Sequence, residues 1–261
     1  MARILEDGIF PGYDKNMSLE GKVAIITGAA GSIARSTAEL FAEKGAKLAL
    51  FDVSDRVAEV AAEISPDALG IVVDLTDVNA IEESVQKVRR HFGKIDILCN
   101  IAGRGHDDLA ENITIEDWNQ HLAVNLTGLF FMSQSVGKVM IEQGFGGKII
   151  NMASQAGIVG LPRHALYGAA KAGVINITKT LANEWGRYHI NVNAVSPTVV
   201  LTPLAVKCWG GERGQEFLKS VPAGRFCDPS EPAACCLFLA SDMADMITGE
   251  NLVIDGGFTV C

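Results

Sequence analysis

The sequence predicts a single doubly wound α/β domain, in which a sheet of seven parallel strands carries helices on both faces. Three observations lead to this class: short apolar runs alternate with longer amphipathic ones, a glycine-containing turn follows the first run, and no repeat, linker or low-complexity tract divides the 261 residues. Alternating strands and helices form right-handed crossovers, which make the sheet parallel. Open α/β sheets of this length often fold as one unit.

Each predicted strand is a short apolar run, and continuously apolar runs indicate burial on both faces of the sheet. The predicted strands are residues 22–27, 47–52, 69–74, 95–100, 147–153, 190–196 and 251–255. Apolar residues spaced three and four apart predict helices that pack on the sheet. The clearest of these helices are residues 36–44, 78–92, 118–132 and 172–185.

The catalytic domain is expected to span residues 19–261, after an N-terminal extension of residues 1–18. Its one irregular region, residues 197–228, contains Pro203 and a Trp-Gly-Gly segment at 209–211. An open sheet places its ligand lid in a long excursion after the carboxyl end of a strand. We therefore expect a substrate lid here; the alternative is a surface insertion without a role.

Composition and charge exclude several classes of protein. Hydrophobic residues make up 48% of the chain and charged residues 20%, which allows a large packed core. The formal net charge is -9 and no dense run of Lys and Arg is present, so nucleic acid is not an expected partner. No signal peptide and no stretch apolar enough to span a bilayer is evident, so we expect a cytoplasmic protein.

A metal site is not expected. The six cysteines lack metal-ligand spacing, and several lie in apolar segments, which is typical of buried free thiols. The five histidines include no pair four residues apart and have no acidic companion.

The turn after the first strand is typical of a dinucleotide site in a Rossmann-type fold. Thr27 and Gly28 end the strand and a helix follows from about Ile33, so backbone amides and a helix N-terminus can bind a pyrophosphate. Asp52 ends the second strand, where a carboxylate can bind the adenosine ribose hydroxyls and repel a 2′-phosphate. This pattern favours NAD over NADP; the alternative is that Asp52 caps the next helix.

Tyr167 and Lys171 lie four residues apart in the segment Y-G-A-A-K, with Ser154 upstream. On a helix, residues four apart share a face, so the ammonium group can lie near the phenol. A free phenol has a pKa of about 10, and bringing it toward 7 requires about 4 kcal/mol of phenolate stabilisation. An adjacent ammonium group and an oxidised nicotinamide ring can supply that amount, so the pair can donate and accept a proton.

An ordered set of motifs resembles the short-chain dehydrogenase/reductase family, in its compact single-domain branch, from about Leu19 to the C-terminus. A Y-x-x-x-K pair alone is common by chance, but the ordered set is specific. In chain order the motifs are T-G-A-A-G-S-I-A (27–34), the acidic end of the second strand, D-L (74–75), N-I-A-G (100–103), V-N-L-T-G (124–128), N-M-A-S (151–154), Y-G-A-A-K (167–171), S-P-T-V-V-L-T-P (196–203) and D-G-G (255–257).

The resemblance implies four catalytic residues. Tyr167 is the general acid/base, and Ser154 holds the substrate oxygen. Lys171 binds the nicotinamide ribose and lowers the pKa of Tyr167, while Asn125 orders a water that links Lys171 to solvent. In alcohol oxidation the phenolate would take the hydroxyl proton as hydride leaves carbon. Taken alone, Asn125 could simply bond a neighbouring backbone group.

The resemblance also implies a groove for NAD, with the Val200 backbone at the carboxamide and Thr202 at the carboxamide or the pyrophosphate. The implied cofactor residues are Gly28, Gly31, Ser32, Ile33, Asp52, Asp74, Leu75, Asn100, Ala102, Gly103, Tyr167, Lys171, Pro197, Val200 and Thr202.

Two segments depart from the family pattern. In the opening turn, Ser32 and Ala34 replace the second and third glycines, and Ala is tolerated at the third, which governs helix–strand packing. Ser32 would be strained if its position needs a positive φ, or its hydroxyl could donate to phosphate. We expect this turn to be mobile without cofactor and to bind NAD no more tightly than in relatives. After the sixth strand, Pro197-Thr198 replaces the usual Pro-Gly.

For the substrate, the sequence resembles the polyol and ketose reductases of the family, such as xylulose reductase and threitol or arabinitol dehydrogenases. The likeness depends on S-P-T-V-V-L-T-P (196–203), on Gln155 directly after Ser154, and on His164 shortly before Tyr167. Gln and His beside the reacting carbon can bind vicinal hydroxyls. The alternatives are a solvent-facing Gln155 and a helix-capping His164. Trp209 could form a wall of the pocket or pack on another subunit.

The sequence therefore predicts an NAD-dependent dehydrogenase that oxidises a small secondary alcohol, diol or sugar alcohol reversibly to the ketone. Members of the family are mostly tetramers, so the resemblance implies a homotetramer. A 3-oxoacyl or steroid reductase is the alternative enzyme, although the acidic charge and Asp52 favour neither an acidic carrier protein nor NADPH. A nucleotide-sensing binding protein without catalysis is a further alternative, supported only by the altered glycine turn.

Overall fold

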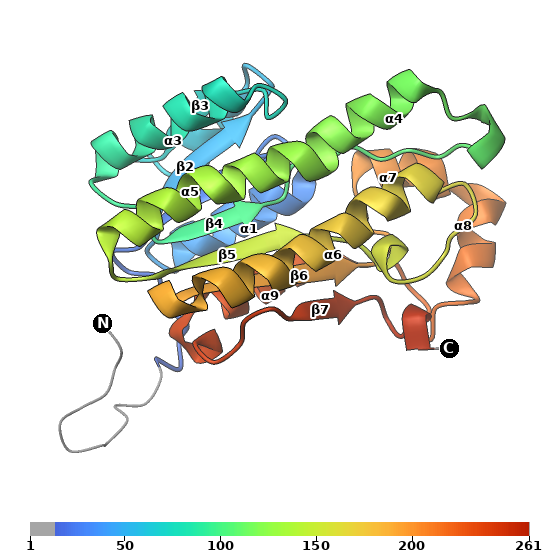
Figure 1. The fold of residues 1–261 in the computed structure, drawn as a ribbon. Helices are drawn as coiled ribbons and strands as arrows, with labels where there is room; N and C mark the ends of the chain where they lie inside the picture. The colour runs from blue at the N-terminus through green and yellow to red at the C-terminus, as the bar shows by residue number, and fades with distance from the viewer. Residues whose placement is uncertain (1–13, 261) are drawn as a thin grey trace.

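A seven-stranded parallel sheet lies between two layers of helices in the computed structural model, which describes residues 14–260 (Figure 1). The strand order is β3-β2-β1-β4-β5-β6-β7, and every neighbouring pair is parallel. This confirms the predicted fold class. Each predicted strand agrees with an observed one to within two residues at either end. The strands are β1 (Val23–Thr27), β2 (Lys47–Asp52), β3 (Leu69–Val72), β4 (Ile97–Asn100), β5 (Gly147–Met152), β6 (Ile190–Pro197) and β7 (Asn251–Ile254).

Helices cover both faces of the sheet, as the alternation of apolar and amphipathic runs predicts. One core packs α1, α2 and α9 against the sheet, and the other packs α3, α5 and α6 against the opposite face. The α-helices are α1 (Ser32–Glu43), α2 (Val57–Ile64), α3 (Val78–Phe92), α4 (Ile115–Leu122), α5 (Leu129–Gln143), α6 (Ala165–Trp185), α7 (Pro203–Trp209), α8 (Gly211–Leu218) and α9 (Ser230–Ala240). Short 3-10 helices are η1 (Ala110–Asn112), η3 (Gln155–Gly157), η4 (Gly186–Tyr188), η5 (Asp242–Ala244) and η6 (Phe258–Val260).

The structure refines two of the predicted elements. The helix expected over 118–132 is divided by a π-helical segment, η2 (Ala123–Gly128), which separates α4 from α5. The strand expected from residue 95 begins at Ile97, because the Ile95 N–H donates to the Gln143 side chain at 2.8 Å and not to a neighbouring strand. The strand propensity of the residue types does not reveal that a side chain takes up a backbone N–H in this way.

The strand order creates a crevice at the point where successive strands stop being added on one side of β1 and begin on the other. From β1 the chain continues through β2 to β3 at one edge, whereas β4 lies on the other side of β1 and continues toward β7. Ligands of open α/β sheets bind at this switch point, outside the carboxyl ends of the strands. The site should therefore lie beyond the ends of β1 and β4.

The irregular region after β6 folds largely into α7 and α8, which extend beyond the carboxyl ends of the strands (Figure 1). Thr202 begins α7 by accepting a hydrogen bond from the Ala205 N–H at 3.1 Å, and Pro203 occupies the first turn, where its missing N–H costs nothing. An isolated bridge between Val200 and Cys227 closes the excursion at its base. Its role as a lid remains a prediction.

Several predictions concern the ends of the chain and the cysteines. Most of the predicted 1–18 extension and the thiol of Cys261 lie outside the described residues, and the Cys208 side chain is not described. The thiols of Cys99, Cys227 and Cys236 are buried and free, as expected. Within residues 14–260, no group of three or more potential ligands is arranged to hold a metal ion, and no helix is long and apolar enough to cross a membrane.

Candidate active site

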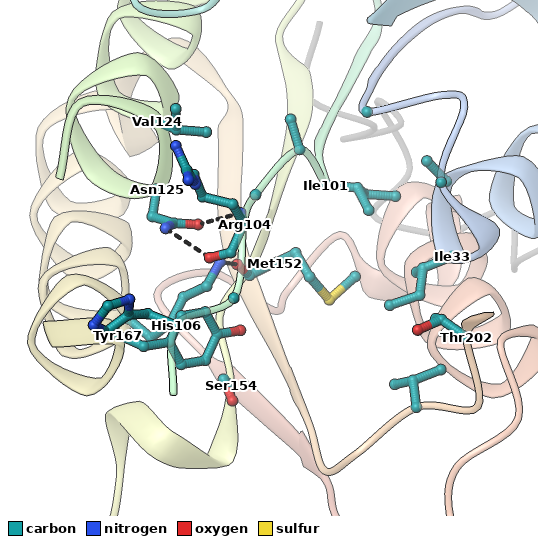
Figure 2. Close-up of a pocket in the computed structure, with 18 of the residues that line it drawn as sticks. Ile33, Ile101, Arg104, His106, Val124, Asn125, Met152, Ser154, Tyr167 and Thr202 are labelled. Atoms are coloured by element: carbon teal, nitrogen blue, oxygen red, sulfur yellow. Dashed lines mark hydrogen bonds between the residues drawn. The ribbon is translucent and has the colours of Figure 1, made fainter. Parts of the chain in front are cut away.

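A cavity of about 1330 Å³ lies at the predicted switch point. In Figure 2, Ser154 and Tyr167 lie on one side of it, Ile33 and Thr202 lie on the opposite side, and Met152 lies between. Sites for drug-sized ligands usually enclose about 300–1,000 Å³. This cavity is therefore large enough for a dinucleotide together with a small second ligand.

The predicted site residues come together at this cavity, with one exception, Asn100. Those that line the cavity are Gly28, Gly31, Ser32, Ile33, Asp52, Asp74, Leu75, Ala102, Gly103, Asn125, Ser154, Gln155, His164, Tyr167, Lys171, Pro197, Val200, Thr202 and Trp209.

Asn100 lies at the end of β4 but is buried behind the cavity. Its Nδ2 donates to Ser133 Oγ and to Asn151 Oδ1, both at 2.9 Å. The side chain thus connects β4 to β5 and α5, and it does not line the cofactor groove as the sequence led us to expect. A strand end offers two faces, and the motif alone does not show which one the side chain occupies.

The turn after β1 needs glycine at Gly28. Its φ is +75°, and a Cβ there would lie 2.8 Å from the Cα of Ala102, so a side chain would collide with the segment after β4. Helix α1 then begins at Ser32, and no side chain caps its N-terminus among the described residues. The amides of this first turn are therefore available to an anion.

Ser32 carries no backbone strain. Gly31 precedes the helix with a φ of -87°, and the described non-glycine residues with positive φ are Met17, Arg163 and His189. The alternative in which Ser32 needs a strained, positive φ is therefore wrong, because α1 has already begun at this residue. Ala34, at the third glycine position, is buried in the core under α1, as its packing role predicts.

Asp52 presents a fixed carboxylate beside this turn. Its Oδ2 accepts a hydrogen bond from the Ala30 N–H and its Oδ1 from the Ser54 N–H, both at 2.9 Å. The alternative that Asp52 caps α2 is wrong, because that helix begins after Arg56 and no side chain caps it. Hydrogen bonds from two amides hold the carboxylate in one orientation at the cavity wall.

Tyr167 and Lys171 lie on the first turns of α6, so the predicted helical spacing holds. Lys171 Nζ lies 5.6 Å from the centre of the Tyr167 ring and donates to the carbonyl oxygen of Met152 at 2.7 Å. A Cβ at Gly103 would lie 2.8 Å from Asn125 Oδ1 and 3.7 Å from Lys171 Nζ. The glycine of the N-I-A-G motif therefore leaves room for the side chains of Asn125 and Lys171.

Burial moves both ionisable groups toward their neutral forms. Burial raises the pKa of the Tyr167 phenol, while its hydrogen bond with Ser154 lowers that pKa and compensates only in part. Burial also lowers the pKa of Lys171 to about 8. Among the protein's own groups, burial dominates the pKa of Tyr167, and the ammonium group of Lys171 hydrogen-bonds to Met152. That Lys171 and an oxidised nicotinamide together lower the pKa of Tyr167 remains a prediction.

Asn125 lies fully buried in the π-helical segment η2. Its Nδ2 donates to the Arg104 carbonyl oxygen at 3.0 Å, and its Oδ1 accepts from the Arg104 N–H at 3.1 Å (Figure 2). The side chain thus binds a neighbouring backbone, an alternative that the sequence left open, and fixes the segment after β4. Its role in ordering a water stays a prediction.

Three predicted substrate residues form the far end of the cavity. Gln155 is only 3% exposed, so the solvent-facing alternative is wrong, and its Oε1 has no partner among the described residues. His164 occupies the N-cap position of α6, but its side chain makes no capping hydrogen bond. Its ring centre lies 6.3 Å from that of Tyr167 and 6.4 Å from that of Trp209. Trp209 therefore forms a wall of the cavity.

Comparisons with known proteins agree with this geometry. A family model described as enoyl-(acyl carrier protein) reductase matches residues 28–259. NAD-dependent glycerol dehydrogenase of Listeria innocua is 49% identical over 252 residues, which cover 96% of this chain and 99% of the relative. D-threitol dehydrogenase of Mycolicibacterium smegmatis is 47% identical over 251 residues, covering 95% and 96%.

Among solved structures, a short-chain type dehydrogenase/reductase from Mycobacterium marinum superposes with a TM-score of 0.89 at 32% identity, over 94% of this chain and 98% of the other. The chain belongs to the short-chain dehydrogenase/reductase family. It is therefore an oxidoreductase that uses a nicotinamide cofactor.

The cavity of this dehydrogenase/reductase fits such a cofactor. The uncapped start of α1 offers amides to a pyrophosphate, and Asp52 lies at the end of β2, where an adenosine ribose would be held. Tyr167, with Lys171 one turn further along α6, lies on the opposite side of the cavity from Ile33 and Thr202 (Figure 2). When bound, the oxidised nicotinamide supplies a hydride acceptor and a positive charge.

Sequence reasoning missed part of the cavity wall. Residues 104–107, directly after the N-I-A-G motif, line the cavity, and so does Thr198 at the altered Pro-Thr site. The available signal was position, because residues that follow the carboxyl end of a central strand border the ligand crevice. Residue type gave no such signal, since the segment R-G-H-D matches no motif of the family.

Proposed function

We propose that this short-chain dehydrogenase/reductase transfers a hydride between a small diol, polyol or sugar alcohol and NAD, reversibly with the ketone. The observation that carries the proposal is Gln155, a buried amide with an unpartnered oxygen directly after Ser154. A buried polar atom without a partner is costly, and a substrate hydroxyl beside the reacting carbon would supply one. The names of the glycerol and D-threitol dehydrogenases support the same substrate class.

In the proposed mechanism, Ser154 positions the substrate oxygen and Tyr167 removes its proton in oxidation or returns it in reduction. The hydrogen bond between Ser154 and the phenol supports this pairing, because it lowers the pKa of Tyr167. The protein alone does not lower that pKa to neutrality, so the positive charge of the bound cofactor completes the activation. Lys171, whose pKa is about 8, can exchange a proton near neutral pH and holds the nicotinamide ribose.

Asp52 supports NAD as the cofactor. Its carboxylate is oriented by two backbone amides at the point where the second strand ends, and a 2′-phosphate there would meet a negative charge. Among the described residues that line this end of the cavity, from Gly28 to Val53, none is Lys or Arg. A site for NADP would need such a cation.

The description of the matching family model, an acyl-carrier-protein reductase, keeps an acyl substrate as the second candidate. Two features favour the small polyol. Trp209 and His164 form a wall of the cavity near Tyr167, which leaves little room for an acyl chain, and the net charge of -9 would repel an acidic carrier protein. A non-catalytic nucleotide sensor is not favoured, because Ser154, Tyr167 and Lys171 converge in one cavity.

The decisive experiment is a panel of diols, polyols and ketoses of three to six carbons, assayed with NAD and with NADP by nicotinamide absorbance. We expect oxidation of vicinal diols with NAD and much weaker activity with NADP. Turnover of 3-oxoacyl thioesters with NADPH, and of no polyol, would replace the proposal. The predicted homotetramer and cytoplasmic location are tested separately, by light scattering and by fractionation of cells.

A further inference from the structure

We propose that Asp107 is a positioning residue that determines substrate size, because its carboxylate holds α7 and α8 over the far end of the cavity. We call the contacts of Asp107 with Arg163 and Arg213 the latch. The inference rests on the proposed function, since it names which polyols the same site would accept. It concerns a residue that matches no motif of the family.

The latch joins three segments that are distant in sequence. Asp107 follows β4 and lines the cavity. Its Oδ1 accepts a hydrogen bond from Arg163 Nε at 2.6 Å, and its Oδ2 accepts one from an Arg213 guanidinium nitrogen at 2.5 Å. Arg163 precedes α6, and Arg213 lies on α8. One carboxylate therefore connects the loop after β4, the approach to the catalytic helix and the lid.

Both carboxylate oxygens of Asp107 are used in this way, and the group stays ionised. Burial raises its pKa, but the hydrogen bonds from Arg213 and Arg163 outweigh burial and hold the pKa below its usual value. The negative charge is therefore present throughout the pH range in which a dehydrogenase would act.

Arg213 connects Asp107 to the cavity wall, because it contacts both Asp107 and Trp209. Its guanidinium carbon lies 4.4 Å from the centre of the Trp209 ring, a cation–π contact. The Trp209 ring lies 6.4 Å from that of His164, and His164 lies 6.3 Å from Tyr167. A lid released from Asp107 would carry Arg213 and Trp209 with it, since the Trp209 ring also packs on Phe217 of the same lid, and would move Trp209 away from the catalytic tyrosine, which lengthens the cavity.

The ion pairs of the latch can break while the lid stays folded. The side chains of Arg163, Arg213 and Asp107 are 41%, 42% and 29% exposed, and ion pairs this accessible are weak. The lid keeps a separate apolar attachment, because the centre of the Phe217 ring on α8 lies 5.3 Å from that of Phe258 near the C-terminus. Substitution of Asp107 should therefore loosen the lid and leave the fold intact.

The test uses Asp107→Asn and Arg213→Gln, with Arg225→Gln as the matched control. Arg225 lies on the same excursion and forms a two-pronged ion pair with Glu231 at 2.6 and 2.7 Å, but it does not line the cavity. With NAD, kcat/KM is measured for polyols of three, four, five and six carbons. In Asp107→Asn, which removes both exposed ion pairs, we expect the six-carbon to three-carbon ratio to rise about tenfold, mainly through KM. In Arg213→Gln, which removes one of the two, the expected rise is about threefold. Arg225→Gln should keep the wild-type ratio.

A second readout does not depend on turnover. Hydrogen exchange of residues 203–218 should become several-fold faster in both latch variants, and Arg213→Lys, which keeps the charge, should restore part of the protection. An equal loss of activity on all chain lengths, or unchanged exchange in this segment, would overturn the inference. If the wild-type protein oxidises no polyol, the proposed function fails, and hydrogen exchange alone then decides whether the latch exists.

Discussion

The two ends of the cavity are constructed in different ways. At the nucleotide end, the groups that face the cavity are backbone amides and a carboxylate held by two amides, all at the ends of β1 and β2. At the substrate end, the cavity is bordered by side chains on connecting segments, among them Gln155, His164 and Trp209. Ring contacts hold His164 and Trp209, and a half-exposed ion pair holds Arg213 against Trp209, whereas strands hold the nucleotide end.

This difference explains why one fold serves many substrates. The nucleotide end follows from the sheet topology, so any chain with this strand order retains it. The substrate end depends on residues that the fold does not dictate, and it can change without disturbing the sheet. The boundary between the two ends is formed by the partly buried Tyr167 and the buried Lys171, and burial opposes the charge on each group.

The largest effect should come from a change at this boundary. Tyr167→Phe removes the hydroxyl that we propose exchanges the substrate proton, so we expect kcat to fall roughly a thousandfold while NAD affinity changes little. Steady-state assays and NAD titration measure the two quantities. Tyr188→Phe, at a tyrosine outside the cavity, is the control and should behave as wild type. A Tyr167→Phe enzyme that keeps most of its kcat would show that the phenol is not the proton carrier.

The next largest effect concerns Lys171 and the pH dependence of the free energy of unfolding. At pH 7 the side chain is protonated in the folded and unfolded states, and the cost of burying its charge is present in full. As pH rises past about 8 the folded protein releases the proton, whereas the unfolded chain keeps it to about pH 10.5, so the free energy of unfolding rises with pH.

Relative to Lys171→Met, the wild-type free energy of unfolding should therefore rise by about 3 kcal/mol between pH 7 and pH 10. Urea unfolding of the cofactor-free proteins measures this difference, in which other titrating groups cancel. Lys179→Met, at an exposed lysine on the same helix, should show no such trend. A flat difference for Lys171→Met would mean that burial does not shift its protonation.

A smaller change is expected at the nucleotide end. Asp52→Ser removes the charge that repels a 2′-phosphate and the acceptor for ribose hydroxyls, so the preference for NAD over NADP should fall about tenfold to a hundredfold. The ratio of kcat/KM values for the two cofactors measures the preference, and Asp55→Ser, at an exposed neighbour, is the control. If selectivity is unchanged, the ribose role of Asp52 is wrong, and the contrast between the two ends weakens.

At both ends of the cavity, the sequence predicts the features that depend on strand ends and on helical spacing. Strands such as β1, which is buried at all five positions, can be predicted from their continuous apolar runs. The carboxyl ends of these strands then give the position of the crevice. Helical spacing likewise places Tyr167 next to Lys171. These inferences need only local periodicity and topology.

Other features depend on three-dimensional environment and could not be predicted in this way. The side chain of Asn100 hydrogen-bonds to Ser133 and Asn151. Ser32 lies in the first turn of α1, so its backbone has an unstrained helical conformation. Burial outweighs hydrogen bonding in setting the pKa of Tyr167. Asp107 meets Arg213 across 106 residues of chain, and no spacing rule detects a pair so distant.

The smallest expected effect distinguishes recognition from packing at the substrate end. Gln155→Met keeps the volume of the side chain but removes the buried oxygen that has no partner among the described residues. If that oxygen accepts a hydrogen bond from a second hydroxyl, the variant should lose about three- to tenfold in kcat/KM for vicinal diols, the equivalent of one hydrogen bond. A mono-alcohol such as 2-propanol has no second hydroxyl, so its kcat/KM should not change, and the ratio of the two is the measurement. Because an unpartnered polar atom is removed, thermal stability should stay equal or rise. Equal losses on diol and mono-alcohol would show that Gln155 only shapes the wall, and the selection of diols would then have to come from His164 or from the lid.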